Sequence, residues 1–338
     1  NTVLYNGNGS ATQAITGVGF EAGFTWIKCR TSAQQNGLFD TIRGTNEWLH
    51  SDSNAAQTTY SGNYGLLSWA SDGFTVGNGS AANASGQSYV AWNFKAGGTA
   101  VANTDGDINS QVSVNNTLGF SIVSYTGSST LGNTIGHGLD SAPDLIICKK
   151  TTGTANWAVW SSTFSSASET LFLDLTSPSN QYINRFGTVT STTFQAGSSG
   201  GGEVNPSGGG MIAYCFTSKP GFSKLGSYTG NGSANGPMVQ TGFEPAFVML
   251  KGAVTSNATN WWIFDNKRNP TNPLGKGLIA NLSAAEQAQG TYLDFYSNGF
   301  AILSGNGEFN NTGDTYIYLA FAADGSTATP SLANSFAT

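Results

Sequence analysis

Charged side chains are scarce in this chain of 338 residues, and the scarcity excludes whole classes of partner. Asp, Glu, Lys and Arg together make 9% of the sequence, where about a quarter is ordinary for a globular domain. The 13 basic residues form no cluster, and the formal net charge is −6. Binding to nucleic acid needs a basic surface that neutralises phosphates, so we predict no nucleic-acid partner.

Long apolar runs are absent too. No stretch of the sequence approaches the roughly 18 apolar residues that a membrane-spanning helix needs. We therefore predict no membrane insertion.

Histidine and cysteine give little material for a metal centre or a disulfide framework. His50 and His137 stand alone, and Cys29, Cys148 and Cys215 form no Cys-x-x-Cys motif. An odd count leaves at least one thiol unpaired within the chain, and each cysteine lies in or beside a strand-like run. The sequence therefore predicts free, buried cysteines, no metal site and no cofactor.

Catalytic patterns are missing as well. Glycoside hydrolysis needs two carboxylates, but the glutamates are isolated and no Glu-x-Asp-x-x-Glu or comparable cluster occurs. Asn103–Asn109 resembles a calcium loop, but Val101 and Val112 occupy the two positions where an EF-hand loop needs carboxylates. No Gly-x-Ser-x-Gly motif joins a strand to a helix. We predict that the protein is not an enzyme.

Glycine and small polar residues are abundant instead, and the sequence repeats itself three times. The 45 glycines and 12% of aromatic residues are typical of folded, turn-rich β structure. Each copy has a strand-like heptad ending in lysine, then an aromatic residue, a phenylalanine after a turn and a closing strand. These landmarks are Lys28, Phe39, Phe74 and Phe94; Lys149, Trp160, Phe194 and Phe216; and Lys251, Phe264, Phe300 and Phe321. Their nearly fixed spacing indicates a repeat architecture.

Short runs rich in aromatic and β-branched residues, bounded by Gly, Asn and Ser, predict strands almost everywhere. Ser71–Phe74 and Ser297–Phe300 contain the Asp-Gly and Asn-Gly pairs of type I′ hairpins. The best helix candidate is Ser283–Gln289, where Ser283 and Glu286 form a capping box. These patterns predict an all-β protein of three tandem antiparallel β-sandwich modules, jelly-roll or lectin-like, with very little helix.

The uneven spacing between the copies gives the domain boundaries. The three repeats are expected at residues 1–97, 119–219 and 220–325, with a linker at 98–118 and a C-terminal tail at 326–338. The linker is rich in Gly, Ala and Asn, and it either adds a strand to a neighbouring repeat or acts as a spacer.

The sharpest local motif pairs an aspartate with an arginine three positions later. It occurs as Asp40 with Arg43 and as Asp265 with Arg268, and repeat 2 has Trp160–Phe164 there instead. Such a motif forms either a salt-bridged corner or a polar ligand site bordered by tryptophans. The candidate ligand-binding residues are Asp40, Arg43, Trp48, Trp261, Trp262, Asp265 and Arg268.

Several phrases resemble those of a known group of proteins. They include Thr25–Lys28, Leu38–Gly44, Ser71–Phe74, Tyr89–Trp92, Lys95–Gly98 and Asn260–Arg268. Over nearly its whole length the chain is similar to uncharacterised repeat proteins of tailed phages that infect marine bacteria and cyanobacteria. Those proteins are regarded as virion or tail-fibre-like components with concanavalin-like sandwich domains, and the resemblance supplies no catalytic residues.

The resemblance implies a structural protein of the virion surface, either a tail fibre, an appendage or a capsid-attached component, with an adhesive or assembly role. Its expected partners are further copies of itself, other virion proteins and host-surface glycans, and its expected location is the virion or the extracellular space. A secreted, lectin-like glycan-binding module is the alternative, and a polysaccharide depolymerase is the least favoured one.

Overall fold

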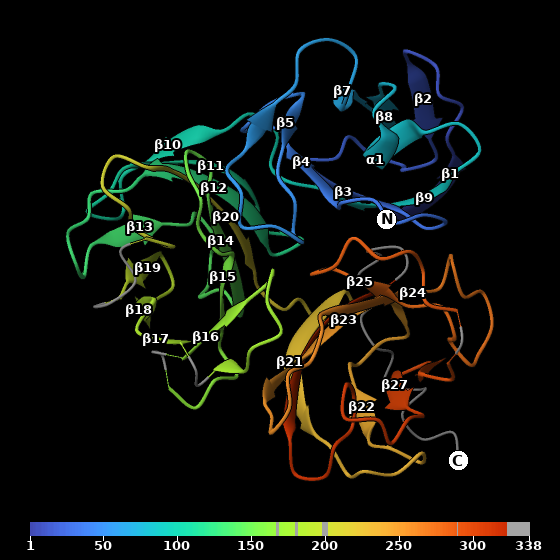
Figure 1. Cartoon of the computed structure of the whole chain (residues 1–338). Coiled ribbons are helices and arrows are strands. Elements are labelled where there is room, and N and C mark those ends of the chain that lie inside the picture. Colours follow the sequence, from blue (N-terminus) through green and yellow to red (C-terminus); the bar gives the residue numbers. More distant parts are fainter. Residues whose placement is uncertain (167–168, 180–181, 198–201, 289, 323–338) are drawn as a thin grey trace.

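The computed structural model of the chain is almost entirely β structure, which confirms the predicted fold class (Figure 1). It describes residues 1–166, 169–179, 182–197, 202–288 and 290–322. The expected tail at 326–338 lies outside these residues. In the described part of the chain, the single α-helix is the one-turn α1 (Ser80–Asn83).

The first third of the chain forms two main sheets, which we call lobe 1. The larger sheet has the order β1 (Thr2–Asn6), β9 (Ser88–Phe94), β3 (Phe24–Cys29), β4 (Gly37–Asp40). The smaller has the order β2 (Gln13–Thr16), β8 (Gly73–Val76), β7 (Leu66–Ala70). A short ribbon of β5 (Glu47–Trp48) and β6 (Thr58–Thr59) completes the lobe.

Lobe 2 repeats this topology. Its larger sheet has the order β10 (Val101–Asn103), β11 (Ser110–Asn115), β12 (Phe120–Thr126), β20 (Gly210–Phe216), β14 (Leu145–Lys150), β15 (Ala158–Ser161), β16 (Glu169–Phe172), β17 (Tyr182–Ile183). Its smaller sheet has the order β13 (Thr134–Gly136), β19 (Thr193–Ala196), β18 (Phe186–Val189).

Lobe 3 follows the same plan. Its larger sheet has the order β21 (Ser223–Thr229), β28 (Thr315–Ala322), β23 (Pro245–Val254), β24 (Trp262–Asp265), β25 (Leu278–Ile279). Its smaller sheet has the order β22 (Met238–Gln240), β27 (Gly299–Ile302), β26 (Leu293–Tyr296). All these pairings are antiparallel, and within the described residues no sheet mixes strands from two lobes. The boundaries between the repeats stay predictions.

The segment 98–118 is part of a sheet rather than a free linker. Its two strands, β10 and β11, pair with each other and extend the larger sheet of lobe 2 through β12. The exposed backbone edge of β12 offers hydrogen bonds that a neighbouring strand can complete, and Val112 on β11 is buried against lobe 2. The segment therefore adds strands to a neighbouring repeat, one of the two roles that its sequence suggests.

The helix expected at Ser283–Gln289 does not form over residues 283–288, and residue 289 lies outside the described part. Tertiary contacts override the local preference. The Glu286 carboxylate pairs with Arg30 (2.9 Å) and Arg268 (3.2 Å) instead of capping a helix. Gln287 forms a bridge to Gly277.

The three larger sheets face one another, and their inner faces build one central core that all three lobes share (Figure 1). Their outer faces pack on the smaller sheets to form a separate core in each lobe. Because both faces are covered, all six residues of β3 are buried. A void of about 20 Å³ in the central core is lined by residues from all three lobes, including Phe24, Ile147 and Phe247.

One buried lysine in each larger sheet ties its lobe to a neighbour. Lys28 Nζ donates to Ser283 O of lobe 3 (2.8 Å), Lys149 Nζ to Asn54 O of lobe 1 (3.1 Å), and Lys251 Nζ to Thr176 O of lobe 2 (3.0 Å). Lobe 2 thus contacts lobe 1, lobe 3 contacts lobe 2, and lobe 1 contacts lobe 3. The three contacts run in one direction around the centre and close a ring.

Candidate functional site

Both predicted Asp–Arg pairs are salt-bridged corners inside the protein. Arg43 Nε lies 2.5 Å from Asp40 Oδ2, and Arg268 Nε lies 2.6 Å from Asp265 Oδ2. Each guanidinium also donates to two further carbonyls, at Leu38 of β4 and Glu47 of β5 for Arg43 and at Ile263 of β24 and Lys276, just before β25, for Arg268. The arginine therefore ties the turn to its own strand and to a second segment of the chain, which is the structural role that the motif also predicts.

The three tryptophans predicted to border a ligand site are buried, so none presents an open face to a ligand. Trp48 is 2% exposed, Trp261 1% and Trp262 7%. Trp261 donates its indole N–H to Phe172 O (2.8 Å), and Trp262 donates to Glu308 Oε2 (2.9 Å). With the four corner residues, all seven side chains predicted to bind a ligand lie in the interior, because both faces of the larger sheets are covered.

The corner aspartates instead accept hydrogen bonds from a neighbouring lobe. Tyr214 of lobe 2 donates its hydroxyl to Asp40 (2.8 Å), and Trp92 of lobe 1 donates its indole N–H to Asp265 (3.0 Å). The residue that corresponds to these two donors in lobe 3, two positions before the closing phenylalanine, is Leu319, which cannot donate. In lobe 2 the aspartate is replaced by Ser161. The departure of repeat 2 from the motif thus matches the missing donor.

The Gly/Asn/Ser loops at the start of each repeat are also fixed, although their composition is that of flexible loops. The Asn83 side chain bonds to the backbone of Asn8 (2.8 Å) and Ser10 (3.2 Å). Asn205 and Asn310 hold the matching loops of lobes 2 and 3 in the same way. These three asparagines are buried.

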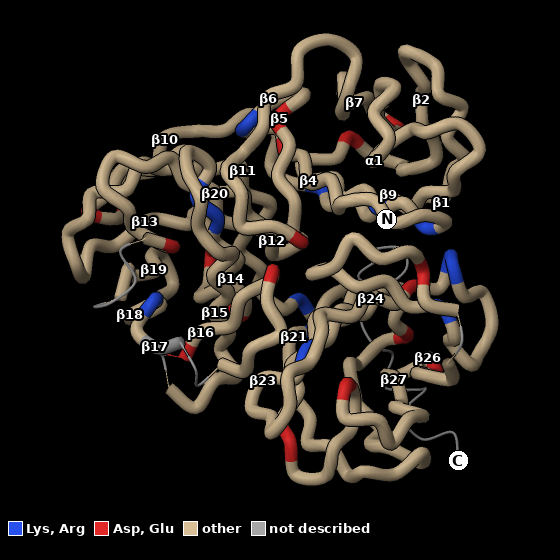
Figure 2. The backbone as a smooth tube through the Cα atoms, viewed as in Figure 1, with Lys and Arg blue, Asp and Glu red and all other residues tan. Residues whose placement is uncertain are grey.

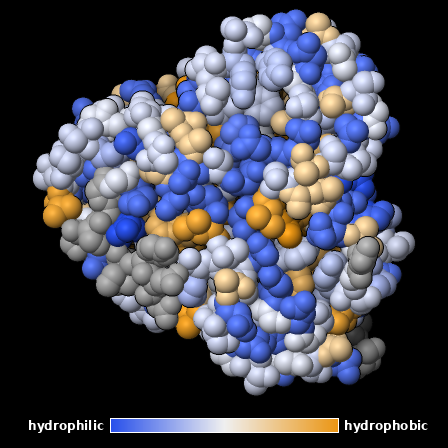
Figure 3. Space-filling view, viewed as in Figure 1, coloured by the Kyte–Doolittle hydropathy of each residue, from blue (hydrophilic) through white to orange (hydrophobic). Residues whose placement is uncertain are grey.

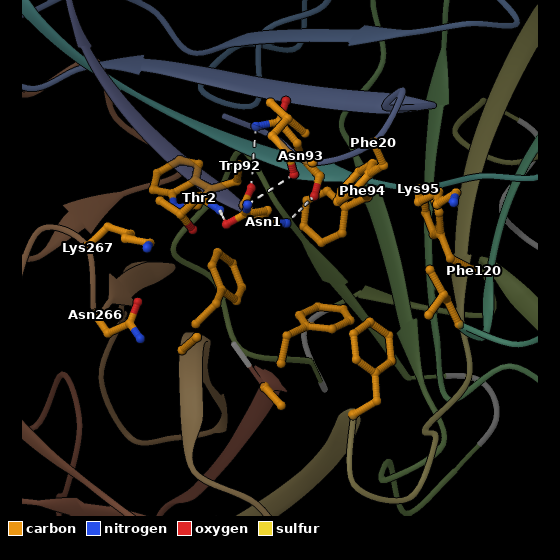
Figure 4. Close-up of a pocket in the computed structure, with 18 residues that line it drawn as sticks. Asn1, Thr2, Phe20, Trp92, Asn93, Phe94, Lys95, Phe120, Asn266 and Lys267 are labelled. Carbon is orange, nitrogen blue, oxygen red and sulfur yellow. Dashed lines mark hydrogen bonds between the residues drawn. The ribbon is translucent and has the colours of Figure 1, made fainter. Parts of the chain in front are cut away.

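The best candidate site is a pocket of about 450 Å³ where the three lobes meet, which we call the inter-lobe pocket (Figure 4). Lobes 1 and 3 supply most of its lining, and lobe 2 supplies Leu118 and Phe120. Its apolar wall is mainly aromatic and consists of Phe20, Trp92, Phe94, Phe120, Phe222, Phe247 and Phe321. The rings of Phe94 and Phe321 pack 5.4 Å apart, which makes part of this wall rigid.

At the pocket, lobe 3 carries a lysine where lobes 1 and 2 place an apolar residue against the central core. In lobe 1, Ile42 stands three positions after Phe39 and packs against the central core. In lobe 2, Phe164 packs there. In lobe 3 the residue three positions after Phe264 is Lys267, which is exposed. Burial of a charged side chain in an apolar space is costly, so Lys267 stays exposed at the rim of the pocket.

The polar groups of the pocket are cationic or neutral. Lys267 and Asn266 lie on one side, with the ammonium of Lys267 toward the centre, and Lys95 lies on the other (Figure 4). No carboxylate belongs to the described lining. The nearest predicted site residues are Asp265 and Arg268, behind the wall residue Trp92: Arg268 lies 5.7 Å over its ring.

Two polar residues of the pocket lining, Asn266 and Lys267, are the two middle positions of the Asp265–Arg268 motif. Sequence reasoning singled out the ends of the motif and missed its middle. The signal was present in the repeats, because the third copy carries a lysine where the first carries the apolar Ile42.

A second hollow, of about 460 Å³, lies between lobes 1 and 2. Arg43, Gln57 and Gln111 are among its lining residues. Unlike the inter-lobe pocket, it has no phenylalanine or tryptophan in its lining, so it offers little apolar surface to a ligand.

Charged residues are sparse over the whole fold (Figure 2). Among the described residues, no group of three or more His, Cys, Asp or Glu side chains is placed to hold a metal ion. No helix in the described part of the chain is long and apolar enough to cross a membrane. The three cysteines are free and buried.

Comparison with known proteins gives one match. The model of a family described as "Domain of unknown function (DUF7483)" matches residues 1–324. Neither the curated proteins nor the solved structures include a match.

Proposed function

Since the chain belongs to the DUF7483 family, we propose its role from its architecture: it is a structural and adhesive protein of a virion surface, a tail fibre, an appendage or a capsid-attached component. The observation that carries this proposal is the closed ring of three lobes around one central core. A body whose lobes are held by a closed cycle of buried contacts resists deformation, as a surface component must. The low content of charged residues, 9% of the sequence and sparse along the fold (Figure 2), suits contact with neutral glycans.

The test is the location and copy number of the protein in purified particles. We expect the protein in the intact particle at a copy number that matches a symmetry axis of the virion, measured by quantitative mass spectrometry and immuno-electron microscopy. Absence from purified particles would defeat the proposal.

Glycan binding is the second candidate, and one surface feature favours it. Tyr64 is 44% exposed, and its ring stacks on that of Tyr60 at 5.1 Å. Tyr60 in turn packs edge-on against the buried Trp48. Backbone bonds from Gly79 to Tyr64 O (3.1 Å) and from Tyr60 to Asn46 O (3.2 Å) hold the pair in place. A rigid, exposed aromatic face of this kind can stack on a sugar ring at low entropic cost.

A glycan array with the wild-type protein and two variants tests this second candidate. Tyr64→Ala should abolish binding to the recognised glycan, whereas Tyr296→Ala, which removes an equally exposed tyrosine in lobe 3, should leave it unchanged. Unchanged binding by the Tyr64 variant would remove the stacked pair as a glycan site.

We also propose that the protein does not degrade the glycans it contacts. The support is the interior position of the charged corners, which leaves no described carboxylate in the inter-lobe pocket. Incubation with host polysaccharides should release no reducing ends, and a fall in their viscosity would refute this part of the proposal.

A further inference from the structure

We propose that the inter-lobe pocket binds a small amphipathic anion: a molecule with an aliphatic or aromatic body and one carboxylate head group. This inference goes beyond the structural role proposed above and does not depend on it. It rests on the size of the pocket, the chemistry of its wall and the charges at its rim.

The size of the pocket selects a small molecule. Sites for small ligands measure about 300–1,000 Å³ and are lined mostly by apolar and aromatic side chains with a few polar groups. The inter-lobe pocket, at about 450 Å³, falls within this range. Figure 3 shows hydrophobic residues at the surface near the junction of the three lobes, on a face that is otherwise largely polar.

The wall selects an apolar body. Phenylalanines from all three lobes line the pocket, and Phe222 and Phe247 each pack on Phe321 at 5.7 and 6.0 Å. Water forms no hydrogen bonds with such a surface. An alkyl chain or aromatic ring that displaces this water gains about 25 cal/mol of binding free energy for each Å² of apolar area that is buried.

The rim selects a negative charge. Lys95 and Lys267 are exposed, and neither forms a salt bridge with a described residue, in contrast to Lys219, which pairs with Asp140. Glu21 and Glu244 stand near lining residues in the sequence but do not line the pocket. In a protein of net charge −6, two unpaired lysines around an apolar opening favour an anion over a neutral or cationic head group.

The rim is also positioned before any ligand arrives. The backbone N–H of Asn266 donates to Ala246 O (2.9 Å), and the N–H of Arg268 donates to Asp265 Oδ1 (2.8 Å). Lys267 lies between these two anchored residues. The Asn266 side-chain amide makes no hydrogen bond to a described residue and can donate to the same head group.

The experiment uses the full chain and three probes of equal chain length: decanoate, decan-1-ol and decyltrimethylammonium, each below its micellar concentration. Isothermal titration calorimetry should show saturable 1:1 binding of decanoate, weaker binding of the alcohol and no binding of the cation. Absence of saturable decanoate binding would overturn the proposal, and so would equal binding of all three probes.

Two variants locate the site. Lys267→Glu should weaken decanoate binding about tenfold or more, the effect of losing one favourable charge contact, and should leave decan-1-ol binding unchanged. The matched control Lys224→Glu makes the same charge change at an exposed position of β21 and should have no effect. Equal weakening by both variants would show that binding depends only on the net charge of the protein, and it would overturn the assignment of Lys267 to the binding site.

Ala246→Trp fills the pocket from its wall and should abolish binding of both decanoate and decan-1-ol, with the melting temperature as a check that the variant folds. Retained binding in a folded Ala246→Trp variant would place the ligand elsewhere. None of these outcomes bears on whether the protein is found in virions.

Discussion

Each lobe buries one lysine ammonium that bonds to carbonyl and hydroxyl oxygens instead of a carboxylate. Lys251 donates to Thr176 O (3.0 Å), Gly252 O (3.0 Å) and Thr259 Oγ1 (2.8 Å). Burial lowers the pKa of Lys251 to about 7, and lowers the pKa values of Lys28 and Lys149 to about 8. Nearby carboxylates offset only part of this effect.

These lysines make stability depend on pH. An unfolded lysine has a pKa of about 10.4, so between pH 7 and 9 the unfolded chain binds more protons than the folded one. The free energy of unfolding should therefore rise with pH across this range and lose this contribution as the pH falls through the folded pKa. Asp174, whose pKa burial raises to about 6, finishes titrating below the range.

Lys251→Met tests this linkage. The variant should flatten the rise in the free energy of unfolding between pH 7 and 9 by about 2 kcal/mol relative to wild type, because one titrating group is gone. Urea denaturation at several pH values measures it. Parallel pH profiles of the two proteins would show that Lys251 keeps an ordinary pKa in the fold.

The buried Asp265–Arg268 pair carries the second prediction. Arg268→Met leaves the Asp265 carboxylate buried without its cation, and the free energy of unfolding should fall by about 3–5 kcal/mol. The control Lys219→Met breaks the ion pair with Asp140, which is 54% exposed, and should change stability little. A similar loss in both variants would contradict the role given to the buried corner.

At this scale the sequence indicated the corners but not which tryptophans are buried. An Asp and an Arg three positions apart at a strand end constrain each other locally, so the motif itself predicts the pair. The exposure of Trp48 and Trp261 depends on which surfaces cover the two faces of a strand, and that is a tertiary property.

At the scale of the structural elements, one buried asparagine in each lobe (Asn83, Asn205 and Asn310) holds a Gly/Asn/Ser loop in a fixed conformation through hydrogen bonds to its backbone. Asn310 accepts a hydrogen bond from the backbone of Asn231 (2.7 Å) and donates to Ser233 O (2.7 Å). Asn310→Ala should lower the free energy of unfolding by about 1–3 kcal/mol, because buried polar groups lose their partners. It should also speed amide exchange over residues 230–236, which hydrogen-exchange mass spectrometry measures. Asn235→Ala, in the same loop but exposed, is the control. Unaltered exchange in the Asn310 variant would show that the loop holds itself.

Strands were predictable from the sequence because aromatic and β-branched runs between glycine-rich loops have few other folded forms. The hairpins at Ser71–Phe74 and Ser297–Phe300 also form, but not with the predicted turn. The strand pairs Ala70–Gly73 and Tyr296–Gly299 close the turns, so each glycine is the first strand residue and not a central turn residue. Gly299 has φ 159°, and a Cβ there would collide with Val239 O of the neighbouring strand.

For the molecule as a whole, the shared central core predicts cooperative unfolding. Each larger sheet has an inner face that only the other two lobes cover, so a lobe alone would expose its aromatic residues to water. Residues 98–219, which include every strand of lobe 2, should fail to give a compact monomer when expressed alone, and calorimetry of the full chain should show one transition with equal calorimetric and van't Hoff enthalpies. Three separate transitions would mean that the lobes fold independently.

The sequence predicted three similar copies but not how they pack. Landmarks such as Phe94, Phe216 and Phe321 are apolar whether they fill the core of one module or meet at a common centre. The structure brings them together, with Phe94 5.9 Å from Phe216 and 5.4 Å from Phe321. The inter-lobe pocket was hidden for the same reason, because it belongs to no single copy.

The ring of lobes has one seam. The chain runs directly from lobe 1 to lobe 2 and from lobe 2 to lobe 3, but within residues 1–322 no peptide link joins lobe 3 to lobe 1. Non-covalent contacts close this junction in the described residues, among them the Arg30–Glu286 ion pair, Lys28 with Ser283 O, and the backbone N–H of Glu286 with Arg30 O (2.8 Å). Heat or pulling that separates the lobes meets no covalent barrier there, so opening should start at the seam. The inter-lobe pocket lies along this junction. A molecule bound there would stabilise the closed ring against opening, and this stabilisation would increase with the concentration of the molecule.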